Sequence, residues 1–81
     1  MDIRTHRGIS SELCGIPVEL TPGRCIVSLS TIPAMAADDT GLVHGGFVFG
    51  MADYAAMLAV NDPNVVLGST EMRFIDRKSV V

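Results

Sequence analysis

The feature that most constrains this chain is a run of apolar and small residues, GGFVFGMADYAAMLAV, which extends from Gly45 to Val60. Asp53 is its one formally charged side chain. On a helical wheel one stripe of large residues falls within an arc of about 60°, and the other faces are apolar as well; the stripe comprises Phe47, Met51, Tyr54 and Leu58. A helix that is apolar all round is normally buried on every side. The run therefore predicts a central helix enclosed by other elements.

The ends of this helix also follow from the sequence. It is expected to begin near Gly45 or Gly46 and to end near Asn61, because Asp62 and Pro63 cannot continue it. The run is shorter than the roughly 20 residues that a membrane span requires, and it contains an acid. We therefore expect no membrane-spanning segment and no membrane partner.

Strands are predicted on both sides of the helix. IPVEL (residues 16–20) and RCIVSLSTI (residues 24–32) alternate in polarity, and the TPG between them is typical of a tight turn, so they indicate a β-hairpin. Residues 33–41 are expected to form a loop. NVVLGSTEMRFI (residues 64–75) predicts a long strand with a bulge at Gly68. Residues 1–15 form an N-terminal segment with a loose or short helix, and residues 16–81 form one partial domain.

Composition narrows the class of protein. A chain of 81 residues holds one domain at most. Because 48% of its residues are hydrophobic, we expect its core to be shared with a partner or with a longer domain. A net charge of −3 argues against nucleic acid as a partner. Cys14 and Cys25 could form one disulfide, but the absence of a secretory signal favours free thiols in the cytoplasm.

Asp53 and the glycines at the helix start are candidate functional groups. An acid in apolar surroundings costs free energy unless something uses it, and it can serve as a general base or as a nucleophile. Alternatively, Asp53 caps or ion-pairs a neighbouring strand. The first amides of a helix lack acceptors and can hold an oxyanion, for which the amide of Gly45 is preferred. The alternative for the Gly45-Gly46 pair is a plain tight turn into the helix.

The spacing of these groups predicts a dimer. Gly45 and Asp53 are separated by roughly 12 Å along one helix, at about 1.5 Å per residue. One reacting carbon cannot contact both groups at that separation. If both act together, Asp53 of one chain must meet Gly45 of another, which predicts a twofold dimer with two composite sites.

The stretch GLVHGGFVFGMADYAAMLA resembles the signature of PaaI-like, hotdog-fold acyl-CoA thioesterases, the phenylacetate-pathway type. In that pattern G-x-x-H-G-G opens the central helix and an acid follows eight residues after the first glycine of the pair. The positions are filled here by Gly41, His44, Gly45, Gly46 and Asp53. The preceding LTPGRCIVSLSTIPAM resembles the first hairpin of the family, and the resemblance extends over residues 16–75.

The resemblance implies an α+β hotdog fold, in which an antiparallel sheet wraps around one central helix. It also implies catalytic roles for Asp53, Gly45 and His44, with His44 orienting the thioester or supporting the loop. The alternative for His44 is a histidine that hydrogen-bonds to the backbone. Substrate-binding roles are implied for four further residues, and Ser69 or Thr70 would hold the attacking water; the four are Gly46, Asp38, Ser69 and Thr70. The alternatives are a solvated loop acid for Asp38 and a strand-surface role for Ser69 and Thr70.

Two departures from the family pattern are evident. Asp38 stands where the family often has asparagine, and Arg77 stands where proline is expected. The last strands of the family are missing, because the chain stops at Val81. The sequence is therefore interpreted as truncated or frame-shifted, which would leave the sheet incomplete.

The leading functional hypothesis is hydrolysis of an acyl-CoA or aroyl-CoA to coenzyme A and a free acid. No metal or bound cofactor is implied, since coenzyme A belongs to the substrate. The expected partners are acyl-CoA and a second copy of the chain, as a homodimer or a dimer of dimers. The main alternative is a non-catalytic hotdog module that binds acyl-CoA or serves as a dimerisation scaffold. A hydratase would need a different pattern of histidine and acid, and an incomplete sheet could leave the chain inert.

Overall fold

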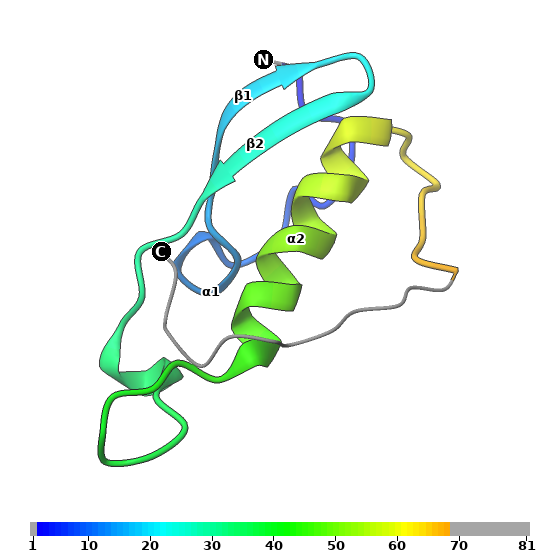
Figure 1. Ribbon diagram of the computed structural model, residues 1–81. Helices are drawn as coiled ribbons and strands as arrows, with labels where there is room; N and C mark the ends of the chain where they lie inside the picture. The colour runs from blue at the N-terminus through cyan, green and yellow to red at the C-terminus, as the bar shows by residue number, and fades with distance from the viewer. Residues whose placement is uncertain (1, 69–81) are drawn as a thin grey trace.

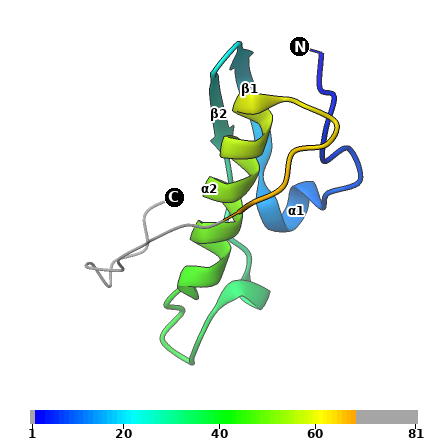
Figure 2. The same ribbon diagram turned by 90° about the vertical axis from the view of Figure 1, so that its right-hand side faces the viewer.

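The computed structural model describes residues 2–68 of the chain. Along that part the elements are α1 (Ser11–Cys14), β1 (Ile16–Thr21), β2 (Arg24–Ser28), the short 3-10 helix η1 (Pro33–Met35) and α2 (Gly45–Val60). β1 and β2 form a two-stranded antiparallel sheet, and α2 lies along one of its faces with α1 packed beside it (Figures 1 and 2). The predicted α+β class is therefore confirmed.

The turn of the hairpin is the one that its sequence predicts. Thr21 pairs with Arg24, so Pro22 and Gly23 form a two-residue connection. Gly23 has a φ of +78°, a conformation that glycine adopts without strain and that a proline-glycine turn requires. The Gly23 amide also donates a hydrogen bond of 3.0 Å to the carbonyl of Ala59. The turn is thereby attached to the C-terminal end of α2.

A bulge in β1 decides which side chains are covered. The pairing register shifts between Pro17 and Glu19, which leaves Val18 as an extra residue on this strand. Pro17 and Leu20 are consequently both half-buried, whereas Val18 is 57% exposed. Strict alternation would have placed Pro17 and Leu20 on opposite faces. The sequence predicted the hairpin but not this bulge, and β2 ends at Ser28 instead of continuing through residue 32.

α2 has the predicted bounds. It begins at Gly45 and ends at Val60, and Asn61 follows in the left-handed conformation with φ +54° and ψ +39°. Asparagine tolerates this conformation better than most residues, and the Asn61 amide donates to the carbonyl of Met57 at 2.8 Å. The helix therefore stops at a defined cap.

The core lies between α2, the hairpin and η1. Its most deeply buried apolar side chains come from β2's continuation, η1 and one face of α2: Leu29, Met35, Tyr54, Met57 and Leu58. Met35 and Leu58 have no exposed surface. Pro33 occupies the first turn of η1, where a missing amide hydrogen costs nothing, and the short helix places Met35 in the core.

The prediction that α2 is buried on all sides is wrong. Four residues at four-residue spacing lie exposed along its full length: Val48, Ala52, Ala56 and Val60. We call this surface the open stripe of α2. It carries no charged side chain, and Val60 is 63% exposed. The physical reason is that a hairpin of two strands covers only one side of a helix, whereas typical sheets have about five or six strands.

The predicted strand over residues 64–75 is not found where it can be assessed. Residues 64–68 are irregular, so within the described part of the chain Gly68 does not lie in a strand. The rest of that prediction, which includes Ser69 and Thr70, lies outside the described residues.

Both thiols are free, as expected. Burial raises the pKa of the Cys25 thiol, which keeps it in the protonated, less reactive form. Within residues 2–68, no helix combines the length and the hydropathy that crossing a bilayer would demand.

Candidate functional site

His44 is held at the start of α2 by two hydrogen bonds. Its amide donates to the carbonyl of Met35 at 2.9 Å, and its side-chain Nδ1 accepts from the amide of Gly46 at 2.8 Å. Because Nδ1 is the acceptor, the proton of the neutral imidazole is on Nε2. The ring also meets Phe47 edge to face, with 6.3 Å between centroids. His44 is thus the N-cap of the helix, which corresponds to the alternative of a backbone-bonded histidine.

Gly46 has a steric function in this cap. A Cβ added there would lie 2.9 Å from Nδ1 of His44 and 3.1 Å from Cε1. Glycine therefore lets the imidazole lie against the first turn of the helix. The Gly46 amide is used by His44, which leaves Gly45 as the glycine at which a ligand could meet the backbone. Among residues 2–68, the Gly45 amide has no hydrogen-bond acceptor.

Asp53 projects from the middle of α2 at the border of the open stripe. The residue is half-buried, and its Oδ1 is buried without a hydrogen-bond partner in the described part of the chain. No described lysine or arginine forms an ion pair with it. The alternative in which Asp53 caps or pairs a neighbouring strand is therefore not seen in residues 2–68. A buried acceptor without a donor costs free energy, which a ligand or another chain would recover.

Asp38 stabilises its own loop. Its Oδ1 accepts hydrogen bonds from the Thr40 hydroxyl and the Thr40 amide, the latter at 2.9 Å. These two bonds, together with a weaker one from the Leu42 amide, lower the pKa of the Asp38 carboxyl. The side chain is exposed, which agrees with the alternative of a solvated loop acid, and the substrate-binding role implied for Asp38 stays a prediction.

The large residues of α2 that were expected in the core differ in how deeply they are buried. Tyr54 and Met57 are buried, whereas Met51 is only half-buried. Burial raises the pKa of the Tyr54 phenol, and the nearby thiols of Cys25 and Cys14 raise it further. Tyr54 therefore stays neutral and acts as a packing residue.

The structure brings only part of the predicted site together. His44, Gly45 and Gly46 form one unit at the start of α2, and Asp53 lies about two turns further along the same helix, roughly 12 Å away. Sequence reasoning missed the carbonyl of Met35, which anchors His44 from η1 and could have been found only from the tertiary fold. No group of three or more metal-binding side chains occurs in the part of the chain described here.

The sequence of the chain is similar to that of a named protein. Over 75 residues, which is 93% of this chain, the sequence is 59% identical to methylthioribose-1-phosphate isomerase from Aquifex aeolicus. The match covers 16% of that isomerase. No family model matches the chain.

Three solved structures share the fold. The uncharacterised protein PH1136 from Pyrococcus horikoshii is 55% identical, with a TM-score of 0.89 over 91% of this chain and 57% of its own. The HP0420 homologue from Helicobacter felis is 30% identical, with a TM-score of 0.77 over 83% and 55%. Cj0977, a sigma28-regulated virulence protein from Campylobacter jejuni, is 30% identical, with a TM-score of 0.73 over 74% and 46%. The chain thus spans about half the length of these relatives.

These comparisons correct the functional predictions. The chain was expected to be a PaaI-like acyl-CoA thioesterase, a hydrolase, but the named relative is an isomerase and none of the three structures is named as a thioesterase. The family resemblance, the thioesterase function and the hydrolase class are therefore wrong. Acyl-CoA as a binding partner is not tested and stays a prediction.

The geometry of the helix start explains why the motif misled. Two residues of the His-Gly-Gly sequence that supported the resemblance have a local structural role, since His44 caps the helix and Gly46 makes room for the imidazole. A motif with a structural role of this kind can recur where the chemistry does not.

Proposed function

We propose that the chain is a dimerising module that binds a small molecule between two copies, within a hotdog-type architecture. In this architecture further sheet and a second chain would enclose α2. Asp53 of one chain and the Gly45 amide of the other would contact the same ligand. The likeness in fold and sequence to three longer proteins supports an architecture that extends beyond the described residues.

The open stripe of α2 is the observation that carries this proposal. A helix that faces water normally turns charged residues towards it, yet Val48, Ala52, Ala56 and Val60 form a continuous uncharged surface. Their small side chains allow another helix or sheet to approach closely. Asp53 lies at the border of the stripe with one oxygen unpartnered among the described residues, so a chain docked there would border the acid.

The ligand site follows from the helix geometry. Because Gly45 and Asp53 lie about 12 Å apart on one helix, they can converge only across two chains. The Gly45 amide would donate to a carbonyl or anionic oxygen, and the Asp53 carboxylate would accept from a donor group of the ligand. His44 would act as a positioning residue, since it sets the direction of the first turn.

Ala56→Glu is expected to convert the dimer into a monomer. An unpaired charge buried in an apolar interface costs several kcal/mol, so the dimer dissociation constant should rise at least about a hundredfold. Sedimentation equilibrium of wild type and variant over a range of concentrations measures the change.

The matched control is Ala34→Glu, which places the same charge on an exposed alanine of η1 and should leave the dimer intact. A wild-type chain that stays monomeric at the highest concentration, or an Ala56→Glu dimer as tight as wild type, would refute the proposal.

Asp53→Leu is expected to stabilise the folded chain by about 1 kcal/mol, since the substitution removes a buried oxygen that has no partner within residues 2–68. Urea unfolding measures the difference, with the exposed Asp39→Leu as a neutral control. Groups kept for binding are commonly replaceable with a gain in stability. If Asp53→Leu instead lowers the free energy of unfolding by about 2 kcal/mol or more, on the order of a lost core contact, Asp53 is structural and the site is wrong.

A second candidate function rests on the 59% identity to the isomerase. In this alternative the chain corresponds to a segment of an enzyme that acts on methylthioribose 1-phosphate, and Asp53 transfers the proton that isomerisation requires. An assay of the chain with methylthioribose 1-phosphate separates the two candidates. Turnover that is lost in Asp53→Asn would favour the second, and absence of turnover with an intact dimer would favour the first.

A further inference from the structure

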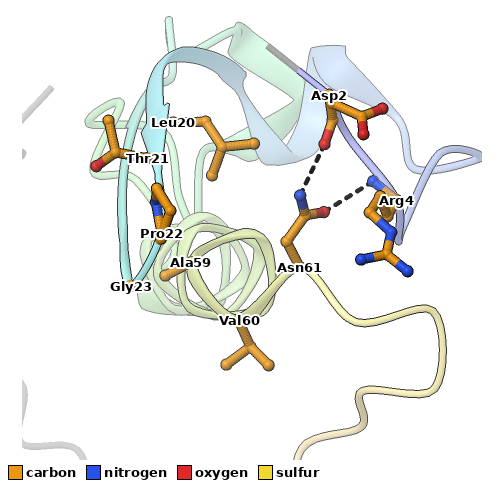
Figure 3. Close-up of a pocket in the computed structure, with 9 residues that line it drawn as sticks. All are labelled: Asp2, Arg4, Leu20, Thr21, Pro22, Gly23, Ala59, Val60 and Asn61. Carbon is orange, nitrogen blue, oxygen red and sulfur yellow. Dashed lines mark hydrogen bonds between the residues drawn. The ribbon is translucent and has the colours of Figure 1, made fainter.

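A pocket of about 370 Å³ lies at the C-terminal end of α2. Figure 3 shows the residues that line it. It is lined by Asp2 and Arg4, by the hairpin turn (residues 20–23) and by the end of α2 (residues 59–61). We call it the C-terminal pocket. Its volume is at the lower end of the range for small-molecule sites.

Asn61 builds this pocket by holding the N-terminal segment in place. Its side-chain oxygen accepts from the Arg4 amide at 2.7 Å, and its side-chain nitrogen donates to the Asp2 carbonyl at 2.7 Å. Figure 3 shows Asn61 between the turn residue Pro22 and these two residues. Both bonds use main-chain atoms of Asp2 and Arg4, so both charged side chains remain free for another role.

The charges of the Arg4 and Asp2 side chains are unpaired in the described part of the chain. Among residues 2–68, neither the Arg4 guanidinium nor the Asp2 carboxylate forms an ion pair. The last carbonyls of α2 add partial negative charge at the same end of the helix. The pocket therefore combines a cationic group, an anionic region and an apolar wall, the last of which is formed by Leu20 and Pro22.

We propose that the C-terminal pocket binds a free α-amino acid with an apolar side chain. The Arg4 guanidinium holds the carboxylate through paired hydrogen bonds, and the Asp2 carboxylate with the helix C-terminus holds the ammonium. The side chain of the ligand lies on Leu20 and Pro22. A simple anion fits less well, because Asp2 and the helix end repel it. Val60 lines this pocket and also belongs to the open stripe, but Arg4, Asp2, Leu20 and Pro22 lie outside that stripe, so leucine binding can fail without affecting the proposed dimer.

The test uses leucine as the probe, followed by two-dimensional NMR of the amides of Gly23 and Asn61. Isocaproate lacks the ammonium group of leucine, and isoamylamine lacks its carboxylate. Leucine should shift both amides and saturate, and each half-ligand should bind about tenfold more weakly, the loss expected for one charged hydrogen-bonded group. Equal binding of leucine and isocaproate, or no shift at either amide, would overturn the proposal.

Substitutions in the chain provide a second test of leucine binding. Arg4→Gln and Asp2→Asn should each weaken leucine binding about tenfold and leave the fold unchanged, since the bonds to Asn61 use main-chain atoms. Arg24→Gln and Asp39→Asn remove the same charges from exposed positions outside the pocket and should bind leucine as wild type does. If Arg4→Gln and Arg24→Gln bind leucine equally well, the site is not at Arg4.

Discussion

Replacing Leu58 with alanine is expected to lower the free energy of unfolding by about 2–5 kcal/mol, the range for a leucine truncated in a packed core. Leu58 has no exposed surface and lies on the face of α2 that packs against the hairpin. The loss has two parts: the transfer of the removed methyl groups to water and the cavity that remains. In a chain of 81 residues such a loss approaches the whole stability of the fold.

Urea unfolding followed by circular dichroism measures this effect. Val66→Ala is the matched control, because Val66 is 79% exposed and its truncation should change the free energy of unfolding by less than about 0.5 kcal/mol. A Leu58→Ala chain as stable as Val66→Ala would show that the contact between α2 and the hairpin contributes little in solution.

The local elements could be predicted from sequence because their signals are local. Gly45 and Asn61 lie at the two ends of a continuous apolar run, and Asp62 with Pro63 cannot extend it. The turn at Gly23 needs a positive φ, and a proline-glycine pair predicts such a turn. These features depend on residues a few positions apart, so pattern and propensity are sufficient to place them.

Features that depend on distant contacts could not be predicted. The bulge at Val18 leaves both Pro17 and Leu20 half-buried, and no residue in IPVEL signals this. Met35 enters the core because η1 folds back on the start of α2, and its carbonyl then anchors His44. The hydrogen bonds of Asn61 to the N-terminal segment join residues more than fifty positions apart. Such contacts are properties of the assembled fold.

The candidate site also combines features that local sequence predicts with features that it could not predict. The sequence pointed to Asp53 because a lone charge in an apolar helix is evident from a short stretch of sequence. Its Oδ1 has no hydrogen-bond partner in the described fold, and its functional role stays a prediction. The sequence could not distinguish a chemical role for His-Gly-Gly from a capping role, because both need the same residues at the helix start. It also predicted a fully enclosed helix, since hydropathy does not say whether the covering surface belongs to the same chain or to another.

Gly15→Ala is the second substitution with a large expected effect, a loss of about 3 kcal/mol in the free energy of unfolding. Gly15 ends α1 with a φ of +97° and a ψ of 179°, a region that is essentially restricted to glycine and strains other residues by about 1–3 kcal/mol. An added Cβ would also lie 2.6 Å from Cγ1 of Val27 and 2.7 Å from the carbonyl oxygen of Ser28. Neither group can yield freely, because both belong to β2, so overpacking adds a cost of similar size.

Gly8→Ala provides the comparison within the same N-terminal segment. Gly8 has no positive φ, and an added Cβ there would meet nothing within 4 Å. Its substitution should be neutral or slightly stabilising, since alanine restricts the unfolded chain. Thermal unfolding of the two variants side by side then separates the general effect of losing a glycine from the positive φ of Gly15 and its contact with β2. Equal midpoints would mean that Gly15 neither keeps this φ nor contacts β2 in solution, because these two features distinguish it from Gly8.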